Sequence, residues 1–238
     1  MIIAANFKTN HTRESTSQFL EALNFFLDAT QNSAEIRVFP PFTALKRRNL
    51  KNSIKIGAQN FYPVANGSFT GEIGLDQLNE FEVASVLIGH SERREILKES
   101  NEFIAQKFSF IKETKKEIIF CIGEPYEVHK LGLEATMEYL LEQFNGIDIE
   151  YENLIVAYEP IWAIGTGESA KIEIIEQVLK ALKAKLPRIP LLYGGSVSAE
   201  NIEDILFLPY CDGVLVGKAS FDVSSFCTLI ELANKVQK

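Results

Sequence analysis

The chain has 238 residues, of which 46% are hydrophobic and 24% are charged, enough to bury the core of one large globular domain over residues 1–238. Its 24 Lys and Arg against 32 Asp and Glu give a formal net charge of -8, which repels phosphate polymers and argues against a nucleic-acid partner. The sequence has no apolar run of about 18 residues that would span a membrane, and residues 1–6 lack the basic flank of a signal peptide.

The cysteines indicate the compartment. Cys121, Cys211 and Cys227 are odd in number and show no C-x-x-C spacing, which is typical of a reducing environment and argues against a disulfide framework or a thiolate zinc site. We therefore expect a cytoplasmic protein without a membrane partner.

Short apolar runs alternate with longer amphipathic ones along the chain. Several of the short runs are continuous in Val, Ile, Leu or Phe, as expected for strands that are covered on both faces. The expected strands are 2–6, 36–39, 54–58, 85–89, 117–122, 154–159, 190–193 and 213–216.

Apolar residues recur at helical spacing between these runs. The clearest segments are 133–144, with Leu133 on the apolar face, 171–186, and a closing helix around 226–233. Eight strands, each followed by a helix, predict an α/β fold: a single (β/α)8 TIM barrel with parallel strands and its chemistry at the C-terminal strand ends. An open doubly wound sheet is the alternative that periodicity leaves open.

Polar residues directly after the strands are expected to converge at one mouth of such a barrel. The set comprises Asn6, Lys8, His90, Glu92, Arg93, Arg94, Cys121, Glu124, Glu159 and the turns Gly194-Gly195-Ser196 and Gly217-Lys218. An amine, an imidazole, several carboxylates and glycine turns in one volume suit proton transfer beside a phosphate.

Three of these side chains match the needs of proton abstraction next to a carbonyl. Glu159 is the candidate base, because the apolar Pro-Ile-Trp segment that follows it partly desolvates a carboxylate. The charge that develops on the carbonyl oxygen must meet a donor already in place, and His90 and Lys8 fit that role.

Glycine-rich turns that lead into helices can hold a phosphate through backbone N–H groups. Gly165, the Gly195-Ser196 pair and the Gly217-Lys218 pair are the candidates. Residues 162–167, with two glycines, could close over the site and exclude water.

Each candidate also has a structural interpretation. His90 could be an ordinary hydrogen-bonded histidine, Glu159 a cap or an arginine partner, and Lys8 a solvated lysine. We expect Glu92, Arg93 and Arg94 to form a structural ion-pair network in the first turn of a helix. Cys121 is expected to be a small buried side chain and not a nucleophile.

Taken in order, several segments resemble one enzyme family along the whole chain. Residues 4–10 read AANFKTN, 69–72 FTGE, 89–94 GHSERR, 158–167 YEPIWAIGTG, 193–197 YGGSV and 212–217 DGVLVG. These motifs resemble those of the triosephosphate isomerases, and the segment 158–167 is the most specific of them.

The resemblance implies interconversion of dihydroxyacetone phosphate and glyceraldehyde 3-phosphate in glycolysis and gluconeogenesis, without cofactor or metal. It implies that Glu159 shuttles the proton, that His90 polarises the carbonyl and that Lys8 and Asn6 stabilise the enediolate. The phosphate contacts it implies are Gly165, Ser196, Gly217 and Lys218, and Lys218 stands where the family normally has a second glycine. The resemblance also implies a homodimer in which the loop around Thr70 reaches the partner's Lys8.

Two competing functions remain at this point. One is another phosphate-binding barrel, an isomerase or aldolase that acts on a larger sugar phosphate. Its metal-dependent versions would need a cluster of His, Asp or Glu ligands, whereas His11, His90 and His129 are scattered without paired spacing. A barrel that binds phosphorylated ligands without turnover would be favoured if Glu159, His90 or Lys8 were missing, and all three are present.

Overall fold

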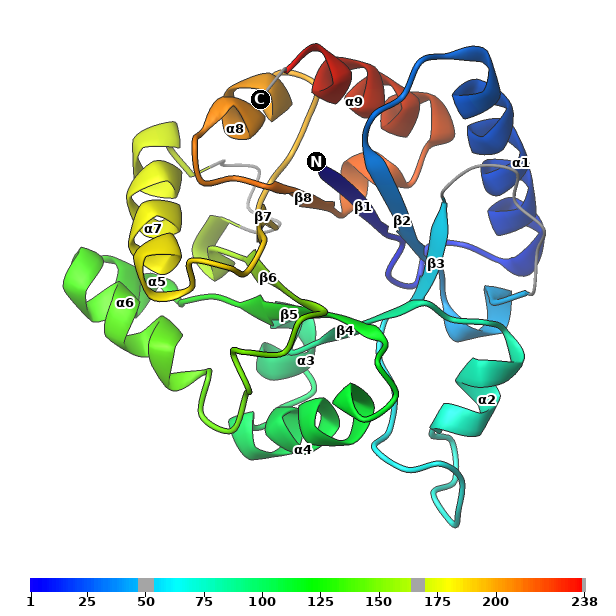
Figure 1. The fold of residues 1–238 in the computed structure, drawn as a ribbon, viewed down its shortest axis with the longest axis horizontal. Helices are drawn as coiled ribbons and strands as arrows, with labels where there is room; N and C mark the ends of the chain where they lie inside the picture. The colour runs from blue at the N-terminus through cyan, green and yellow to red at the C-terminus, as the bar shows by residue number, and fades with distance from the viewer. Residues whose placement is uncertain (47–53, 164–169, 237–238) are drawn as a thin grey trace.

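A computed structural model of the chain describes residues 1–46, 54–163 and 170–236. All of the described strands run parallel and pair in chain order, and the first also pairs with the last, so that the sheet closes into a barrel (Figure 1). The strands are β1 (Ile2–Asn6), β2 (Glu35–Phe39), β3 (Lys55–Ala58), β4 (Ser85–Ile88), β5 (Glu117–Ile122), β6 (Leu154–Tyr158), β7 (Leu191–Tyr193) and β8 (Gly213–Val216). The predicted (β/α)8 barrel is confirmed, and the open doubly wound sheet is excluded.

Helices surround this barrel (Figure 1). They are α1 (Arg13–Ala29), α2 (Leu75–Glu80), α3 (Ser91–Glu95), α4 (Asn101–Lys112), α5 (Tyr126–His129), α6 (Leu133–Glu142), α7 (Ile172–Lys185), α8 (Ile202–Phe207) and α9 (Val223–Lys235). The described residues also form the short 3-10 helices η1 (Phe42–Ala44), η2 (Ile161–Ala163) and η3 (Lys218–Ser220). None of the helices within the described ranges is long and apolar enough to cross a membrane.

Local sequence signals explain where the helices begin. Thr12 caps α1 by accepting a hydrogen bond from the backbone N–H of Ser15, whose hydroxyl accepts one from the backbone N–H of Thr12. Asp222 caps α9 by accepting hydrogen bonds from both the backbone N–H and the hydroxyl of Ser225. These caps satisfy backbone donors that have no partner inside the helix.

The apolar faces follow the predicted periodicity with one exception. In α7, Ile175, Val178, Leu179 and Leu182 are buried, as predicted. In α6, Leu133 lies at helical spacing from the buried Leu140 but is itself 41% exposed, so the apolar face is not buried at this end. Leu133 is the first residue of α6 and lies at the end of the helix, where the barrel does not cover it.

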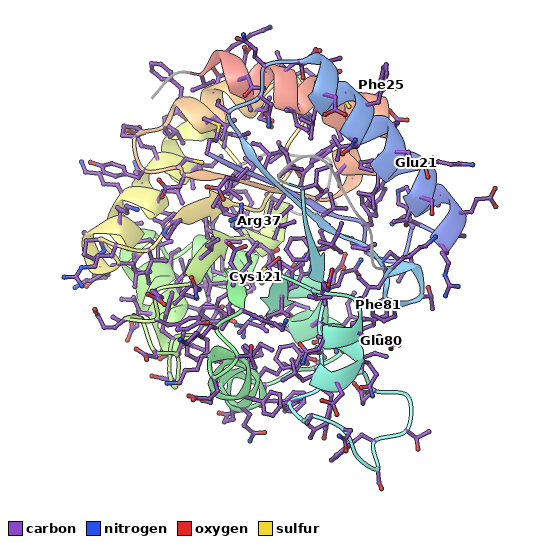
Figure 2. All side chains as sticks on the ribbon, turned by 45° about the vertical axis from the view of Figure 1, so that its right-hand side comes forward. Glu21, Phe25, Arg37, Glu80, Phe81 and Cys121 are labelled. Carbon is purple, nitrogen blue, oxygen red and sulfur yellow. The ribbon has the colours of Figure 1, made fainter. Side chains whose placement is uncertain are left out.

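The core has two layers. Alternate strand residues such as Ala4, Ile119 and Leu192 form a cluster inside the barrel, and a larger cluster lies between the strands and the helices. Figure 2 shows Arg37 and Cys121 among the strands and Phe25 on the outer surface of α1. Because all strands are parallel, their C-terminal ends meet at one mouth, where the predicted polar residues gather.

Candidate active site

Lys8 lies just beyond the end of β1 in a left-handed backbone conformation, with φ at 52°. This conformation is unfavourable for a residue with a side chain, so its surroundings must hold it in place. The side-chain oxygen of Asn6 accepts the Lys8 backbone N–H at 3.1 Å, and the amide of Gln59 donates to the Lys8 carbonyl at 2.8 Å. The Lys8 ammonium then donates to the Glu92 carboxylate at 2.6 Å. Lys8 is therefore fixed at both its backbone and its charged end.

His90 follows β4 and caps the short helix α3. Its Nδ1 accepts the backbone N–H of Glu92 at 3.2 Å, which requires this nitrogen to be unprotonated. The hydrogen bond therefore assigns the proton of the neutral ring to Nε2. His90 Nε2 lies 3.3 Å from Glu159 Oε1, so it points its proton toward the candidate base.

Glu159 follows β6 directly and is almost completely buried, with 1% of the residue exposed. Its Oε2 accepts the backbone N–H of Ser91 at 2.9 Å, and its Oε1 faces His90. A Cβ on Gly194 would lie 2.9 Å from Glu159 Cγ, so only glycine leaves room for the carboxylate there. The structure thus places Glu159 and His90 in contact at one mouth of the barrel, with Lys8 joined to them through Glu92, which lies near His90.

A second buried carboxylate, Glu124, stands behind the candidate base. Its Oε1 accepts hydrogen bonds from Trp162 Nε1 at 2.8 Å and from the Tyr158 hydroxyl at 3.1 Å. Burial raises the pKa of Glu124, and the hydrogen bonds from Trp162 and Tyr158 offset part of that shift. Trp162 is thereby tied to the end of β5.

The candidate phosphate turns lie at the same mouth. A Cβ on Gly217 would lie 3.6 Å from Lys8 Nζ, so this turn adjoins the Lys8 ammonium. Lys218 is exposed and begins η3, and it is not among the described non-glycine residues with positive φ, so a lysine fits there without strain. The Ser196 hydroxyl donates to the carbonyl of Ala163 at 2.8 Å. Gly165 and most of the expected closing segment 162–167 lie outside the described residues.

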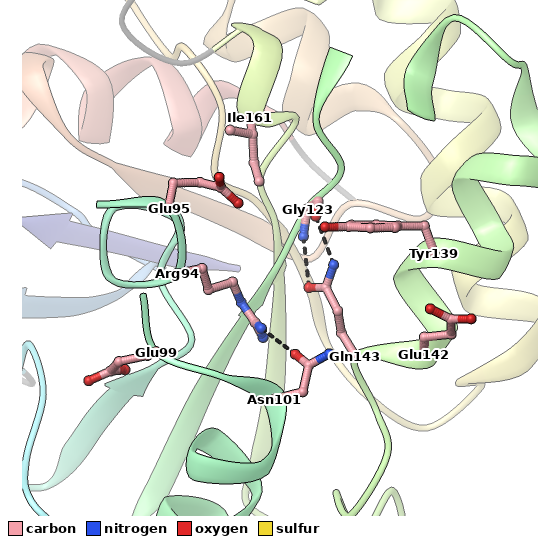
Figure 3. Close-up of a pocket in the computed structure, with 9 residues that line it drawn as sticks. All are labelled: Arg94, Glu95, Glu99, Asn101, Gly123, Tyr139, Glu142, Gln143 and Ile161. Carbon is pink, nitrogen blue, oxygen red and sulfur yellow. Dashed lines mark hydrogen bonds between the residues drawn. The ribbon is translucent and has the colours of Figure 1, made fainter. Parts of the chain in front are cut away.

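The expected ion-pair network of α3 is only partly correct. Arg93 does pair with Glu99 at 2.6 Å. Arg94 instead donates to the carbonyl of Gly89. It also donates to the side chain of Asn101, as Figure 3 shows. Glu92 pairs with Lys8 across the mouth, because the first turn of α3 points that carboxylate at β1 and away from its neighbouring arginines.

Cys121 is fully buried in the barrel interior, as predicted. Burial, with a further contribution from the Glu159 charge, raises the pKa of its thiol well above the usual range. A thiol that stays protonated is a poor nucleophile, which agrees with a packing role.

A pocket of about 210 Å³ lies on the outer side of this region, between α3, α4 and α6 (Figure 3). Its lining includes Arg94, Tyr139, Gln143 and Ile161. The Gln143 amide donates to the Gly123 carbonyl at 2.8 Å and accepts the Gly123 N–H at 3.2 Å. The pocket therefore lies behind the strand ends and is distinct from the mouth that holds His90 and Glu159.

Sequence reasoning missed some of the residues that build the site. Gln59 follows β3 directly, so the rule that selected polar residues after the other strands would also have found it. The backbone N–H of Ser91 and the pairing of Glu92 with Lys8 carry no signal in the sequence, because they depend on how β1, α3 and β6 meet in space. Among the described residues, no group of three or more His, Cys, Asp or Glu side chains is placed to hold a metal ion.

Comparisons with known proteins agree with this geometry. A family model described as triosephosphate isomerase matches residues 1–233. A protein named triosephosphate isomerase from a Sulfurovum species is 56% identical over 230 residues, covering 97% of this chain and 99% of the relative. One of the same name from a Nitratiruptor species is 53% identical over 237 residues and covers 100% of both chains. A third, from Wolinella succinogenes, is 52% identical over 231 residues, covering 97% of this chain and 99% of the relative.

Proposed function

This chain belongs to the triosephosphate isomerase family, and from that premise we propose that Glu159 and His90 carry out its reaction as base and electrophile. The chain interconverts dihydroxyacetone phosphate and glyceraldehyde 3-phosphate, a step of glycolysis. The observation that best supports the two roles is the 3.3 Å approach of His90 Nε2 to the buried carboxylate of Glu159. Triosephosphate isomerases are the standard example of a carboxylate base working with a neutral histidine.

The proposed reaction moves a proton between adjacent carbons. The Glu159 carboxylate takes a proton from the carbon beside the substrate carbonyl, and negative charge develops on the carbonyl oxygen. The Nε2–H of His90 donates a hydrogen bond to that oxygen and stabilises the enediolate. The hydroxyl proton of the first carbon then passes to the former carbonyl oxygen by way of the His90 imidazole, while Glu159 returns its proton to the carbon that carried the carbonyl, so that the new carbonyl forms at the first carbon. One carboxylate can serve both carbons because they are adjacent. It regains its negative charge when it returns the proton, and is then ready for the next turnover.

The remaining site residues are assigned to binding and charge stabilisation. Lys8 lies beside Gly217, where its ammonium would meet both the enediolate and the phosphate, and Asn6 supports its backbone. We assign the phosphate to the turns of Gly165, Ser196 and Gly217-Lys218. Peptide N–H groups in such turns bind an anion without a buried positive side chain.

We further propose that the enzyme is a cytoplasmic homodimer that needs no cofactor. The loop between β3 and α2, which carries Thr70, projects away from the barrel (Figure 1). Phe69 on this loop is 42% exposed, and Ile96 and Leu97, which follow α3, are 71% and 59% exposed. An apolar side chain exposed on a projecting loop is suited to burial against a second copy.

The chemical roles are tested by isomerase assays of the wild type and Glu159→Gln with glyceraldehyde 3-phosphate, in chelator and without added metal. We expect chelator-resistant turnover that falls by about 10³-fold or more in a folded Glu159→Gln variant, because the amide cannot accept the proton. Full activity in the variant would overturn the assignment of the base. A folded but inactive wild type would favour a barrel that binds phosphorylated ligands without turnover.

Sedimentation of the wild type and of Thr70→Asp tests the dimer. A dimeric wild type would support the interface, provided that the Thr70→Asp dimer is weaker and is already dissociated at protein concentrations where the wild type is still a dimer. A wild type that sediments as a monomer at micromolar concentration would rule it out.

A further inference from the structure

His129 has no part in the mechanism proposed above, yet it is held in a specific place. It is the last residue of α5, and its ring stacks on the indole of Trp162 with 4.0 Å between ring centroids and 22° between planes. Its Nδ1 lies 3.7 Å from Glu124 Oε1, which is too long for a direct hydrogen bond. The contact between His129 and Trp162 is therefore mainly one of ring against ring.

Trp162 belongs to the turn that follows the base. Its indole donates to the Glu124 carboxylate at 2.8 Å, and the backbone N–H of the preceding residue, Ile161, donates to the Glu124 carbonyl at 3.2 Å. One face of the indole is covered by His129. The position of this turn thus depends on Glu124 and on the imidazole.

The turn that carries Trp162 is connected to Glu159 by a short stretch of chain. Only Pro160 and Ile161 separate the base from Trp162 along the chain. A Cβ on Gly123 would lie 1.9 Å from the Glu159 carbonyl oxygen, so the two backbones are already in contact. Because the Glu159 backbone has no free space beside Gly123, it cannot rearrange to compensate for a shift of the turn. We therefore expect such a shift to move the Glu159 side chain.

Few titratable groups face His129 within the described residues. The titratable groups that face it in the described structure are Glu124 at the end of β5, Tyr158 of β6, Tyr126 of α5 and, beyond Glu124, Tyr139 of α6. Glu124 is the carboxylate among them, and its Oε2 has no hydrogen-bond partner within the described residues. Burial lowers the pKa of His129, so the neutral ring is the resident form near pH 7.

We propose that His129 is a positioning residue for the isomerase reaction, whose flat ring holds the Trp162 indole against Glu124 and thereby fixes the turn that follows the base. This inference rests on the proposed function, because it acts through Glu159. His129 touches neither the substrate nor the reacting atoms.

The chain contains a single tryptophan, so fluorescence excited at the red edge of the spectrum, where tyrosine does not absorb, reports on Trp162 alone. A protonated imidazole quenches an indole that it touches. We expect the wild-type fluorescence to fall on acidification along a one-proton curve centred below the ordinary histidine value of about 6.5, and His129→Phe to lack this transition. The same curve in both proteins would overturn the contact.

Steady-state kinetics test the consequence for turnover. His129→Phe keeps a flat ring on the indole, so its kcat should stay within about twofold of the wild type. His129→Ala and His129→Leu lose the ring, and their kcat should fall about three- to tenfold with KM changed by less than about twofold. Glu127→Ala, an exposed change on the same helix, should behave as the wild type and controls for general loosening of α5.

Three results would overturn the inference. They are wild-type kcat in both His129→Ala and His129→Leu, an equal loss in His129→Phe, or a loss confined to KM. Including His129→Leu keeps the test valid if the alanine variant fails to fold. An inactive wild type would instead overturn the proposed function, and this inference with it, so the two failures are distinguishable.

Discussion

Arg37 of β2 places a guanidinium among the barrel strands (Figure 2). Its partner Glu117 is the first residue of β5, so the pair lies at the N-terminal end of that strand, opposite the active site. The Arg37 side chain is 2% exposed and forms two parallel hydrogen bonds with the Glu117 carboxylate, and Glu35 and Lys55 complete the cluster. Burial alone would lower the pKa of Arg37, but the hydrogen bonds and charge of Glu117 outweigh it and raise the pKa. The pair is stable because each ion compensates the other, so loss of one partner should be more harmful than loss of both.

Glu117→Ala should therefore lower the free energy of unfolding by about 3 to 5 kcal/mol, since it leaves Arg37 buried without its main partner. The double variant Arg37→Leu, Glu117→Leu should lose less than Glu117→Ala, because no unpaired charge remains inside the barrel. Urea unfolding at one protein concentration measures both values. If the double variant loses at least as much free energy of unfolding as Glu117→Ala, the prediction is wrong. The attraction between Arg37 and Glu117 would then exceed the cost of removing both charges from water.

At the scale of single residues, the site was predictable only where a side chain follows a strand. Lys8, His90 and Glu159 were found in this way, because parallel strands bring their C-terminal ends together whatever the sequence between them. The 3.3 Å approach of His90 to Glu159, and the left-handed backbone of Lys8, depend on atomic positions that no periodic pattern encodes. Lys8, for example, keeps its strained conformation through a hydrogen bond from Gln59, which lies 51 residues away in the sequence.

At the scale of elements, a buried carboxylate joins α3 to α4. The Glu99 side chain, 6% exposed, accepts hydrogen bonds from Arg93 of α3 and from Lys107 of α4. The Lys107 ammonium also donates to the side chain of Asn60, beyond β3. Burial alone would raise the pKa of Glu99, but the bonds from Arg93 and Lys107 reverse the shift and lower it. A carboxylate with a lowered pKa in the folded state contributes stability above its unfolded pKa and loses it as the pH falls through the folded value.

Glu99→Gln should consequently reduce the free energy of unfolding by roughly 2 to 4 kcal/mol at neutral pH, because Lys107 stays buried without a counterion. The difference from the wild type should be constant above about pH 5 and should shrink as the pH falls below about 4, where the wild type also loses the charge. Urea midpoints measured from about pH 7 down to about pH 3.5 give both curves. Glu113 is exposed at the end of α4, so the urea midpoints of Glu113→Gln should follow those of the wild type at every pH. If the midpoints of Glu99→Gln stay a constant distance below the wild type at all pH values, the proposed dependence of stability on Glu99 ionisation is wrong.

Elements were easier to predict than contacts, for a physical reason. Strands such as β1 and β5 begin and end at the predicted residues, because a strand covered on both faces is a continuous apolar run. The periodic face of α7 was equally clear, since its whole length lies on the barrel. Leu133 in α6 misled because periodicity marks a face of a helix but does not say how far along the helix the barrel extends.

At the scale of the whole molecule, an acidic protein must attract an anionic substrate. The formal net charge of -8 repels a triose phosphate, so positive charge close to the mouth has to offset the wider field. Lys8 is largely neutralised by Glu92, whereas Lys218 is exposed at the start of η3 beside the proposed phosphate turn. Lys218 is therefore well placed to raise the local concentration of substrate.

Lys218→Ala should lower kcat/KM about three- to tenfold at low ionic strength, and by less than about twofold at roughly 0.5 M salt, where the Debye length is only a few ångströms. Lys235→Ala is the matched control, because it removes the same charge from the far face of the barrel. Lys235 is exposed in the last turn of α9. The side chain of its neighbour Asn234 accepts a hydrogen bond from the backbone N–H of Ser33, just before the start of β2, so Lys235 lies at the end of the barrel opposite the mouth. Equal losses in both variants would show that net charge alone governs capture. A loss for Lys218→Ala that persists at high salt would point to a direct bond with the phosphate, and only a salt-sensitive loss confined to Lys218 supports local steering at the mouth.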